Sequence, residues 1–382
     1  MKFSCTQENL RTALTLISHI AARQGSLPIL SNVLIRAESR ALTLVTTNLE
    51  LGMTYHLRGK VEEDGVFTVN AKLLSDVVGL LPKDRIDATV AGSELELRCR
   101  GNGTTVRGMD AAEFPLIPTI EPHADARMNA AAFHSALGRT AFAVASSESR
   151  PELSGVLWTF GPKEVTVAAT DSYRLSEVVL PFTVSTVAPG TAVIVPGRTV
   201  AELLRVLSVT QDGAEDAPEV VLTPTASQLL VTVGSLALVS RLIDGTYPDY
   251  TQILPRTWTT RVVISRGELQ TAARAAGLFA RTGVNDVHLR MLPGERQCIV
   301  RSENAQLGAH QAILDAEVEG EEVTTILNSR YLLEGLAAIA GEQVAIEVTG
   351  PAAPVVVRPV EGVAGGEADA AKYLYVIMPI KQ

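Results

Sequence analysis

The chain repeats one order of helix and strand signals three times, with a period as long as a whole domain. The clearest anchors are the points where a strand-like run passes into a helix-like run, at Asn70, Pro196 and Asn328. The first two anchors are 126 residues apart and the last two are 132 apart. Self-similarity at this period excludes a solenoid of short repeats and predicts three domains of one fold within the 382 residues. Duplication alone leaves the function open, because one fold can host many activities.

Apolar spacing within each block predicts two helices and several strands. Helical stretches carry apolar residues every three or four positions, as Leu10, Leu14 and Ile17 do, whereas runs such as 94–99 and 228–233 alternate apolar and polar residues. Each domain is therefore expected to be α+β, with two helices packed on antiparallel sheet. The helices are predicted at 7–23, 70–81, 129–149, 197–208, 265–282 and 328–341, and Pro-containing connectors delimit domains at 1–123, 124–256 and 257–382.

The composition is that of a folded protein without a membrane segment. Apolar residues make up 46% and aromatic residues only 4%, so aliphatic side chains are expected to fill the cores. No run approaches the roughly 18 apolar residues of a membrane helix, and the first residues lack the pattern of a signal peptide, so a cytoplasmic location is expected. Cys5, Cys99 and Cys298 are odd in number and far apart, which favours buried thiols over a disulfide or a zinc site.

Motifs that carry catalysis are missing. The chain has no phosphate-binding Gly-x-x-x-x-Gly-Lys-Ser/Thr loop, and residues 100–104 lie between strand patterns, as a hairpin turn does. Asp171 and Ser172 lack a nucleophile elbow, and the carboxylates of 62–64 and 319–322 resemble solvated turns without metal-ligand spacing. We expect no catalytic residue, no metal and no cofactor. A metal-dependent nuclease or hydrolase on duplicated domains and a purely structural scaffold are the alternatives.

Charge is distributed unevenly between the predicted helices and the rest of the chain. The net charge of −9 argues at first against nucleic acid, but the six predicted helices together carry ten basic and six acidic side chains, which leaves −13 for the remainder. Arg198 and Arg205, like Arg274 and Arg281, are seven residues apart and therefore share a helical face. If the helices of all domains face one side, that side tolerates DNA without gripping it. The alternative is that each arginine lies on an ordinary solvated helix face.

Five motifs are spread from one end of the chain to the other, at 1–3, 27–30, 169–175, 244–250 and 375–380. Together they resemble the beta subunit of bacterial DNA polymerase III, the sliding clamp. The resemblance implies the DNA clamp fold, a head-to-tail homodimer of six similar domains whose helices line a central hole around duplex DNA. It also implies a processivity factor whose middle domain binds short linear peptides from the replicative polymerase, the clamp loader and repair proteins.

The same resemblance implies which residues form the peptide groove. They belong to the middle domain and to the C-terminal tail (residues 376–380), and they are Leu153, Thr170, Tyr173, Arg174, Leu175, Pro248, Ile253, Val376, Ile377, Met378, Pro379 and Ile380. An apolar cleft of this kind suits aliphatic and aromatic anchors, and methionine adapts to several partners. The alternative for the tail is an ordinary last strand, although Pro379 indicates an edge or the end of a ladder.

Two further sets of residues follow from the resemblance. DNA contact is assigned to the helices and nearby loops, through Arg23, Lys72, Arg139, Arg150, Arg198, Arg205, Arg274 and Arg281. Arg23 takes this role because Gln24 stands where relatives have a basic residue, and 149–152 lacks the aromatic residues found in relatives. Ring closure is assigned to Val106 in the first domain and Leu278 in the third. The Gly-rich run 362–369 is expected to be a flexible loop.

Overall fold

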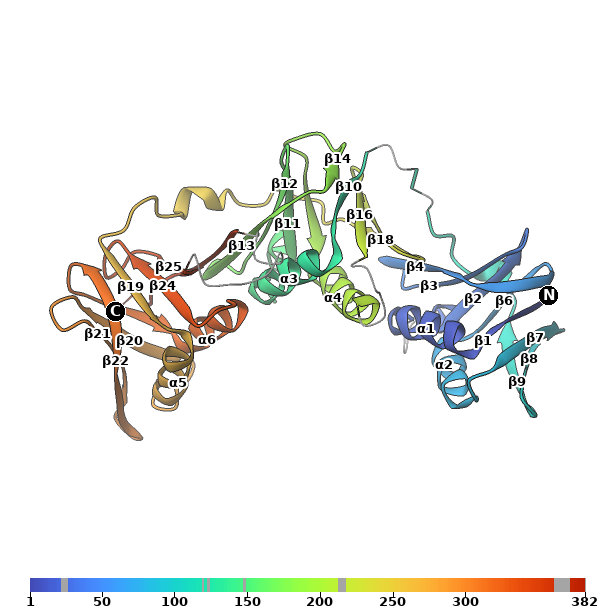
Figure 1. The fold of residues 1–382 in the computed structure, drawn as a ribbon, viewed down its shortest axis with the longest axis horizontal. Helices are drawn as coiled ribbons and strands as arrows, with labels where there is room; N and C mark the ends of the chain where they lie inside the picture. Colours follow the sequence, from blue (N-terminus) through green and yellow to red (C-terminus); the bar gives the residue numbers. More distant parts are fainter. Residues whose placement is uncertain are drawn as a thin grey trace. The chain divides into compact units, whose positions relative to one another are not determined.

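The computed structural model describes residues 1–21, 27–118, 120–121, 124–146, 149–211, 218–360 and 372–381. The contacts divide the chain into two compact units, each built on one antiparallel sheet (Figure 1). The first unit holds Met1–Ala130, Val184–Val187 and Arg205–Leu242, and the second holds Ala131–Thr183, Ala188–Leu204 and Ile243–Gln382. The second repeat therefore contributes residues to both units.

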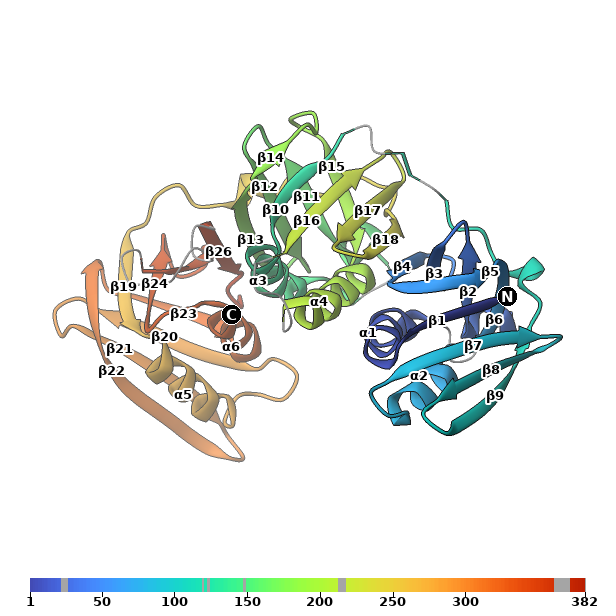
Figure 2. The same ribbon diagram turned by 45° about the vertical axis from the view of Figure 1, so that its right-hand side comes forward.

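The first unit contains the first repeat and, among the described residues, five strands of the second, three of which are linked by hairpins. Among the described residues its sheet has the strand order β14-β10-β16-β17-β18-β4-β3-β2-β6-β9-β8-β7-β1-β5. Helices α1 (Gln7–Ile17) and α2 (Ala71–Leu80) lie side by side on it (Figure 2). The strands are β1 (Lys2–Thr6), β2 (Asn32–Glu38), β3 (Ala41–Thr47), β4 (Leu51–Leu57), β5 (Gly59–Glu63), β6 (Gly65–Asn70), β7 (Arg85–Ala91), β8 (Glu94–Cys99), β9 (Asn102–Met109), β10 (Ala126–Asn129), β14 (Val184–Ser185), β16 (Glu219–Pro224), β17 (Gln228–Val233) and β18 (Leu236–Arg241).

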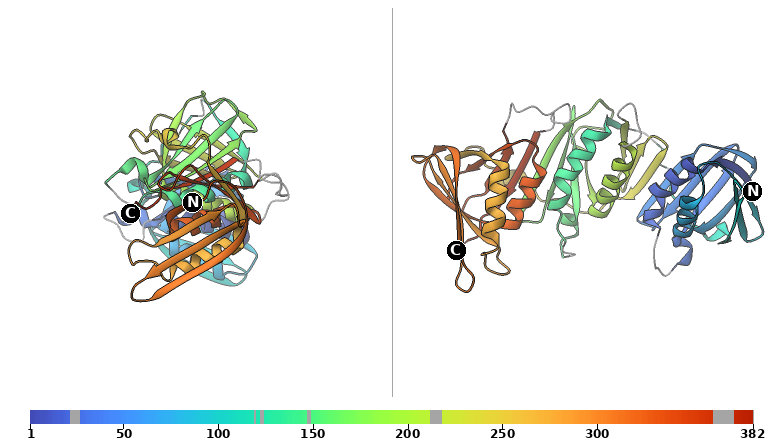
Figure 3. Two further views of the ribbon diagram at one scale, coloured as in Figure 1. Left: turned by 90° about the vertical axis from the view of Figure 1, so that its left-hand side faces the viewer. Right: turned by 60° about the horizontal axis from the view of Figure 1, so that its bottom comes forward.

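The second unit joins the remainder of the second repeat to the third. Its sheet has the order β15-β11-β12-β13-β26-β25-β24-β19-β22-β21-β20-β23 among the described residues. Helices α5 (Arg266–Gly277) and α6 (Ser329–Ala338) lie side by side on it (Figure 3), while α3 (Ala130–Thr140) and α4 (Gly197–Gln211) belong to the second repeat. The strands are β11 (Gly155–Phe160), β12 (Glu164–Thr170), β13 (Arg174–Pro181), β15 (Ala192–Pro196), β19 (Thr260–Ser265), β20 (Asp286–Leu292), β21 (Gln297–Asn304), β22 (Gly308–Gly320), β23 (Val323–Asn328), β24 (Gln343–Val348), β25 (Val355–Pro359) and β26 (Lys372–Ile377).

The last strand of the chain holds the second and third repeats in one sheet. Strand β26 pairs with β13 on one side, with Ile377 opposite Arg174, and with β25 on the other, with Ile377 opposite Val355. Its residues from Tyr373 to Ile377 are buried on both faces. A strand paired on both sides and buried on both faces cannot detach without exposing backbone groups and apolar surface, so the two repeats share one core at this point.

The helix starts follow the polar residues that the sequence indicated. The side-chain oxygen of Asn70 accepts from the backbone N–H of Leu73 at 2.9 Å, and that of Asn328 accepts from Arg330 at 2.9 Å. Each side chain replaces a partner that the first turn of a helix lacks. Both predicted caps are confirmed, and Pro196 ends β15 one residue before α4 begins.

The predicted helix ends are less accurate. The predicted helix 129–149 ends at Thr140 and is followed only by a short 3₁₀ turn, because the Thr140 hydroxyl donates back to Ala136 O at 3.0 Å and the backbone becomes extended at Val144. The predictions 7–23, 265–282 and 328–341 also run too far, since α1, α5 and α6 end at Ile17, Gly277 and Ala338. The prediction 197–208 is too short, because α4 continues to Gln211.

The cores consist mainly of aliphatic side chains, as the composition predicts. In the second repeat the fully buried Trp158 meets Phe133 edge to face, with ring centroids 5.4 Å apart. Cys5, Cys99 and Cys298 are buried free thiols, as predicted, and burial raises the pKa of Cys5 and of Cys298 to about 12. No helix in the described part of the chain is long and apolar enough to cross a membrane.

Close packing of α6 on β26 leads to a testable pair of substitutions. A Cβ added at Gly335 in α6 would overlap the ring of Tyr375, whose hydroxyl donates to Tyr331 O at 2.9 Å. We expect Gly335→Ala to lower the free energy of unfolding by about 1–3 kcal/mol, as overpacking does. Gly79 in α2 has open space around its Cα. Gly79→Ala is expected to raise stability by up to about 1 kcal/mol, and equal effects in urea unfolding would contradict the packing.

Candidate functional site

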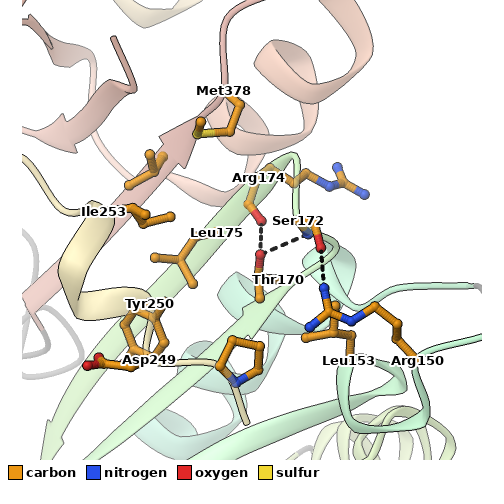
Figure 4. A pocket seen from close by; sticks show the side chains of 12 residues that line it. Arg150, Leu153, Thr170, Ser172, Arg174, Leu175, Asp249, Tyr250, Ile253 and Met378 are labelled. Carbon is orange, nitrogen blue, oxygen red and sulfur yellow. Dashed lines mark hydrogen bonds between the residues drawn. The ribbon is translucent and has the colours of Figure 1, made fainter.

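An apolar cavity of about 140 Å³ opens within the second unit, where the second repeat meets the last strand (Figure 4). Its base is formed by the end of β12, the start of β13 and the end of β26. Two short 3₁₀ helices, Pro151–Ser154 and Tyr250–Ile253, form its sides. The lining residues are Arg150, Leu153, Thr170, Ser172, Arg174, Leu175, Pro248, Asp249, Tyr250, Ile253, Val376 and Met378.

Aliphatic side chains give the cavity its character. Leu175 and Val376 are buried and pack in one cluster with Tyr250, while Leu153 is almost fully buried. Ile253 is 45% exposed at the edge and offers apolar surface to solvent. An apolar recess with an exposed apolar edge gains free energy when another apolar side chain covers it.

A tight turn, residues 171–174, shapes one wall. Thr170 Oγ1 donates to Arg174 O at 2.6 Å and accepts from Ser172 N at 3.1 Å, while Asp171 Oδ1 accepts from Tyr173 N and Arg174 N. Ser172 adopts a φ of +77°, a left-handed conformation that favours glycine. These hydrogen bonds hold the backbone in that conformation and keep the wall rigid.

The C-terminal tail is tied to this turn. Met378 N donates to Tyr173 O at 2.8 Å, and two residues later Ile380 N donates to Ile326 O at 2.8 Å. Pro379 lies between these two bonded residues and has no N–H to offer, so it marks the end of the regular ladder as the sequence indicated. Met378 is thereby placed at the cavity with a fixed backbone.

Two tyrosines fasten the segment before the 3₁₀ helix Tyr250–Ile253 to the sheet. The hydroxyl oxygen of Tyr247 accepts from Thr170 N at 3.0 Å, and the Tyr250 hydroxyl donates to Glu177 Oε2 at 2.6 Å. Burial raises the pKa of Tyr247 to about 12, and burial together with the charge of Glu177 raises the pKa of Tyr250 further. Both phenols are therefore neutral at neutral pH, and their hydrogen bonds hold this segment on the sheet.

Eight of the predicted groove residues line the cavity: Leu153, Thr170, Arg174, Leu175, Pro248, Ile253, Val376 and Met378. Tyr173, Pro379 and Ile380 belong to the adjoining turn and tail but do not line it. Ile377 requires a correction. It is fully buried, and because side chains alternate along a strand, it points to the face opposite Val376 and belongs to the core.

Sequence reasoning did not assign Ser172, Asp249 or Tyr250 to the groove. All three lie inside the two motifs at 169–175 and 244–250, so their position in the sequence was a usable signal. Asp249 Oδ1 accepts from Thr251 N at 3.2 Å and starts the 3₁₀ helix that forms one side of the cavity. The local role of Asp249 is thus to place Ile253.

Arg150 was predicted to contact DNA, and the structure places it among the residues that line the cavity. Its Nε donates to Glu152 Oε1 at 3.0 Å and its Nη1 donates to Ser172 Oγ at 3.3 Å (Figure 4). Glu152 therefore orients Arg150 along the edge of the cavity.

The other residues predicted for DNA contact have different surroundings. Lys72 is exposed and paired with Asp76 at 2.8 Å, and Arg198 and Arg274 are exposed. Arg281 is paired with the buried Asp286 at 2.8 Å, and Arg139 lies over the ring of Tyr373 at 5.9 Å. The guanidinium of Arg205 donates to Thr15 O at 3.0 Å and to Leu16 O, which satisfies carbonyls near the end of α1. Arg23, Gln24 and the loop 362–369 lie outside the described residues.

The two residues predicted for ring closure also differ. Leu278, just after α5, is 74% exposed and available to a partner. Val106 is only 3% exposed, because it lies in β9 opposite Leu95 with its side chain in the core of its own unit. The assignment of Val106 to a subunit interface is therefore wrong for its side chain.

Comparisons with known proteins agree along the whole chain. Sequence models of the DNA polymerase III beta subunit match residues 1–118 (N-terminal domain), 127–249 (central domain) and 251–380 (C-terminal domain). A Beta sliding clamp of Synechococcus elongatus is 31% identical over 385 residues, which span 100% of this chain and 99% of that protein. Among solved structures, the DNA polymerase III subunit beta of Pseudomonas aeruginosa superposes with a TM-score of 0.91 at 26% identity, covering 100% of both chains.

A second Pseudomonas aeruginosa sliding clamp structure, bound to griselimycin, gives a TM-score of 0.89 at 26% identity and full coverage of both chains. Family models, relatives and structures thus point to one family, with a fold of three repeated domains. The chain belongs to the family of the bacterial DNA polymerase III beta subunit, the beta sliding clamp.

Proposed function

We propose that this protein is a DNA sliding clamp that closes as a head-to-tail homodimer around duplex DNA and tethers the replicative polymerase, the clamp loader and repair proteins through short peptides. Its domains are 1–123, 124–256 and 257–382. The observation that carries the proposal is the apolar cavity formed by the turn 171–174, the 3₁₀ helix Tyr250–Ile253 and the C-terminal strand. The protein acts by encircling DNA and by docking client peptides, without a catalytic residue.

Client docking is supported by the chemistry of the cavity. Its walls are apolar, its backbone is held by hydrogen bonds, and the flexible thioether of Met378 lies at its opening. Preformed apolar pockets of this kind bind an aliphatic or aromatic anchor with little ordering cost, and methionine adapts to anchors of different shape. One site therefore suits several client peptides.

Ring closure is supported by two strand edges that are open in the described chain. Residues 102–107 of β9 pair only with β8, and residues 308–315 of β22 pair only with β21. An open edge is a template for another strand, and a heterologous pair of edges joins copies head to tail. Each unit also has exposed apolar side chains: Leu73, Leu80 and Met109 in the first unit, and Leu278, Leu307 and Ile313 in the second.

DNA passage is supported by exposed basic side chains on the helices. Lys72, Arg198 and Arg274 lie on α2, α4 and α5, one helix from each repeat. Scattered single cations attract phosphates without building a sequence-specific site, which is the weak binding that sliding requires. Arg205 supports this role least, since its guanidinium already binds Thr15 and Leu16.

Retention on DNA tests encirclement. A closed ring cannot leave circular DNA, so protein loaded by a clamp loader is expected to remain on a nicked circular plasmid in 0.5 M salt. This salt concentration weakens the affinity that comes from phosphate contacts by roughly tenfold or more. Cutting the same plasmid once should release the protein within minutes, which gel filtration measures. Equal retention on the circular and the linear DNA would rule out encirclement.

Leu278 tests the ring interface. Leu278→Asp places a charge where an apolar contact is expected, so the dimer should weaken by roughly 100-fold or more in dissociation constant. Leu116, 90% exposed in the connector after β9 and outside both open edges, provides a matched control, and Leu116→Asp should leave the dimer intact. Light scattering over a dilution series measures both. A Leu278→Asp protein that stays dimeric to nanomolar concentration removes this residue from the interface.

Met378 tests the cavity. Met378→Ala removes an apolar side chain from the opening, and client-peptide affinity is expected to fall about tenfold, or roughly 1.4 kcal/mol. The dimer should persist, and Leu116→Ala should bind as the unmodified protein does. Calorimetric titration reports the affinity. Unchanged affinity in Met378→Ala would exclude this side chain from the peptide site.

A further inference from the structure

We infer that Arg174 is a positioning residue that anchors the wall of the apolar cavity to helix α6 and does not itself contact the client. This inference rests on the proposed client-binding function and deepens it, because the resemblance alone assigned Arg174 to peptide contact. Arg174 is among the residues that line the cavity, but its guanidinium in Figure 4 points away from Leu175 and Tyr250.

Three different elements hold the guanidinium. Its Nε donates to Asp171 Oδ2 at 3.0 Å, its Nη2 donates to Phe142 O at 2.7 Å, and its Nη1 donates to Glu334 Oε2. Asp171 belongs to the turn 171–174, Phe142 follows α3, and Glu334 lies in α6. A planar guanidinium suits this role, because its donors leave in fixed directions.

Aromatic rings and burial close the guanidinium off from a ligand. Its carbon lies 4.5 Å from the ring centroid of Tyr331 in α6 and 5.3 Å from that of Phe142, both within cation–π range. The side chain is only 10% exposed. Burial lowers the pKa of Arg174, but the hydrogen bond to Glu334 and the nearby negative charges raise it by more, so the group stays charged. A client carboxylate or carbonyl would have to displace one of these partners.

Asp171 connects the Arg174 guanidinium to the turn that forms the cavity wall. One carboxylate oxygen receives the Arg174 guanidinium, and the other receives the backbone N–H groups of Tyr173 and Arg174. The same turn accepts Met378 N at Tyr173 O, and it places Thr170 and Ser172 in the lining. The chain of contacts thus runs from α6 through Arg174 and Asp171 to the residues that would touch a client.

The expected consequence is a loss of preorganisation when the anchor on α6 is removed. The turn contains a left-handed Ser172, a conformation that persists only where surrounding bonds impose it. If Glu334 can no longer accept from Arg174, the turn and Met378 sample more positions and the client must order them on binding. Affinity then falls although every lining side chain is still present.

Glu334→Gln provides the test, because Glu334 is half-exposed and does not line the cavity. The matched control is Glu347→Gln, which disturbs the ion pairs of Glu347 with Arg358 and Arg261 in the third repeat. The probe is a fluorescein-labelled peptide with a Leu-Phe pair flanked by alanines, titrated by anisotropy against the full-length protein. We expect three- to tenfold weaker binding for Glu334→Gln and unchanged binding for Glu347→Gln.

A double-variant cycle separates positioning from contact. Arg174→Met should weaken binding at least as much as Glu334→Gln, and the double variant should bind no worse than Arg174→Met alone. Arg174→Lys keeps the charge but loses the planar guanidinium with its several donors, so it should not restore the affinity for the peptide. Additive losses in the double variant, or a loss in Arg174→Met with none in Glu334→Gln, would overturn the inference in favour of direct client contact.

Two further outcomes also decide the matter. Equal weakening by Glu334→Gln and Glu347→Gln, in step with their urea unfolding midpoints, would reduce the effect to general stability and overturn the inference. If the unmodified protein fails to bind the peptide, the client-binding function fails and the inference fails with it. Binding by the unmodified protein and equally by Glu334→Gln overturns the inference alone.

Discussion

The pairing of β26 with β13 is the interaction on which the site depends. It brings the last strand of the chain beside the second repeat, with Val376 opposite Leu175 and Ile377 opposite Arg174. Side chains alternate along a strand, so this register turns Val376 toward the cavity and Ile377 into the core. A slip of one residue would exchange them and remove the apolar base, and it would also break the bond from Met378 N to Tyr173 O.

The repeat also explains why a cavity forms beside the second repeat. After the first repeat, the connector packs Phe114 and Ile117 against Ile29, Leu34 and Val45, so its own side chains cover the sheet. After the second repeat, the corresponding connector folds into the 3₁₀ helix Tyr250–Ile253, which forms the edge of the recess. Tyr247 and Tyr250 bond to Thr170 N and Glu177, and so hold this connector in place.

The roles of charged side chains were the hardest to predict from the sequence. Arg150, Arg174 and Arg205 were all assigned to external ligands, and the structure gives each of them partners within the chain. A guanidinium has several donors and a long stem, so it readily satisfies carbonyls and carboxylates that are distant in sequence. Some of those partners are distant in sequence and leave no local pattern: Glu334 is 160 residues from Arg174, and Thr15 is 190 residues from Arg205.

The sequence by itself determined the repeat, the α+β class, the helix starts and most of the cavity lining, because periodicity, capping residues and short motifs are local signals. Helix ends, the burial of Val106 and the orientation of Ile377 were decided only in the tertiary structure, since they depend on which surface a neighbouring element covers. The same holds for the anchorage of Arg174 on α6. It arises because β26 brings the third repeat beside β13, and no local pattern records that contact.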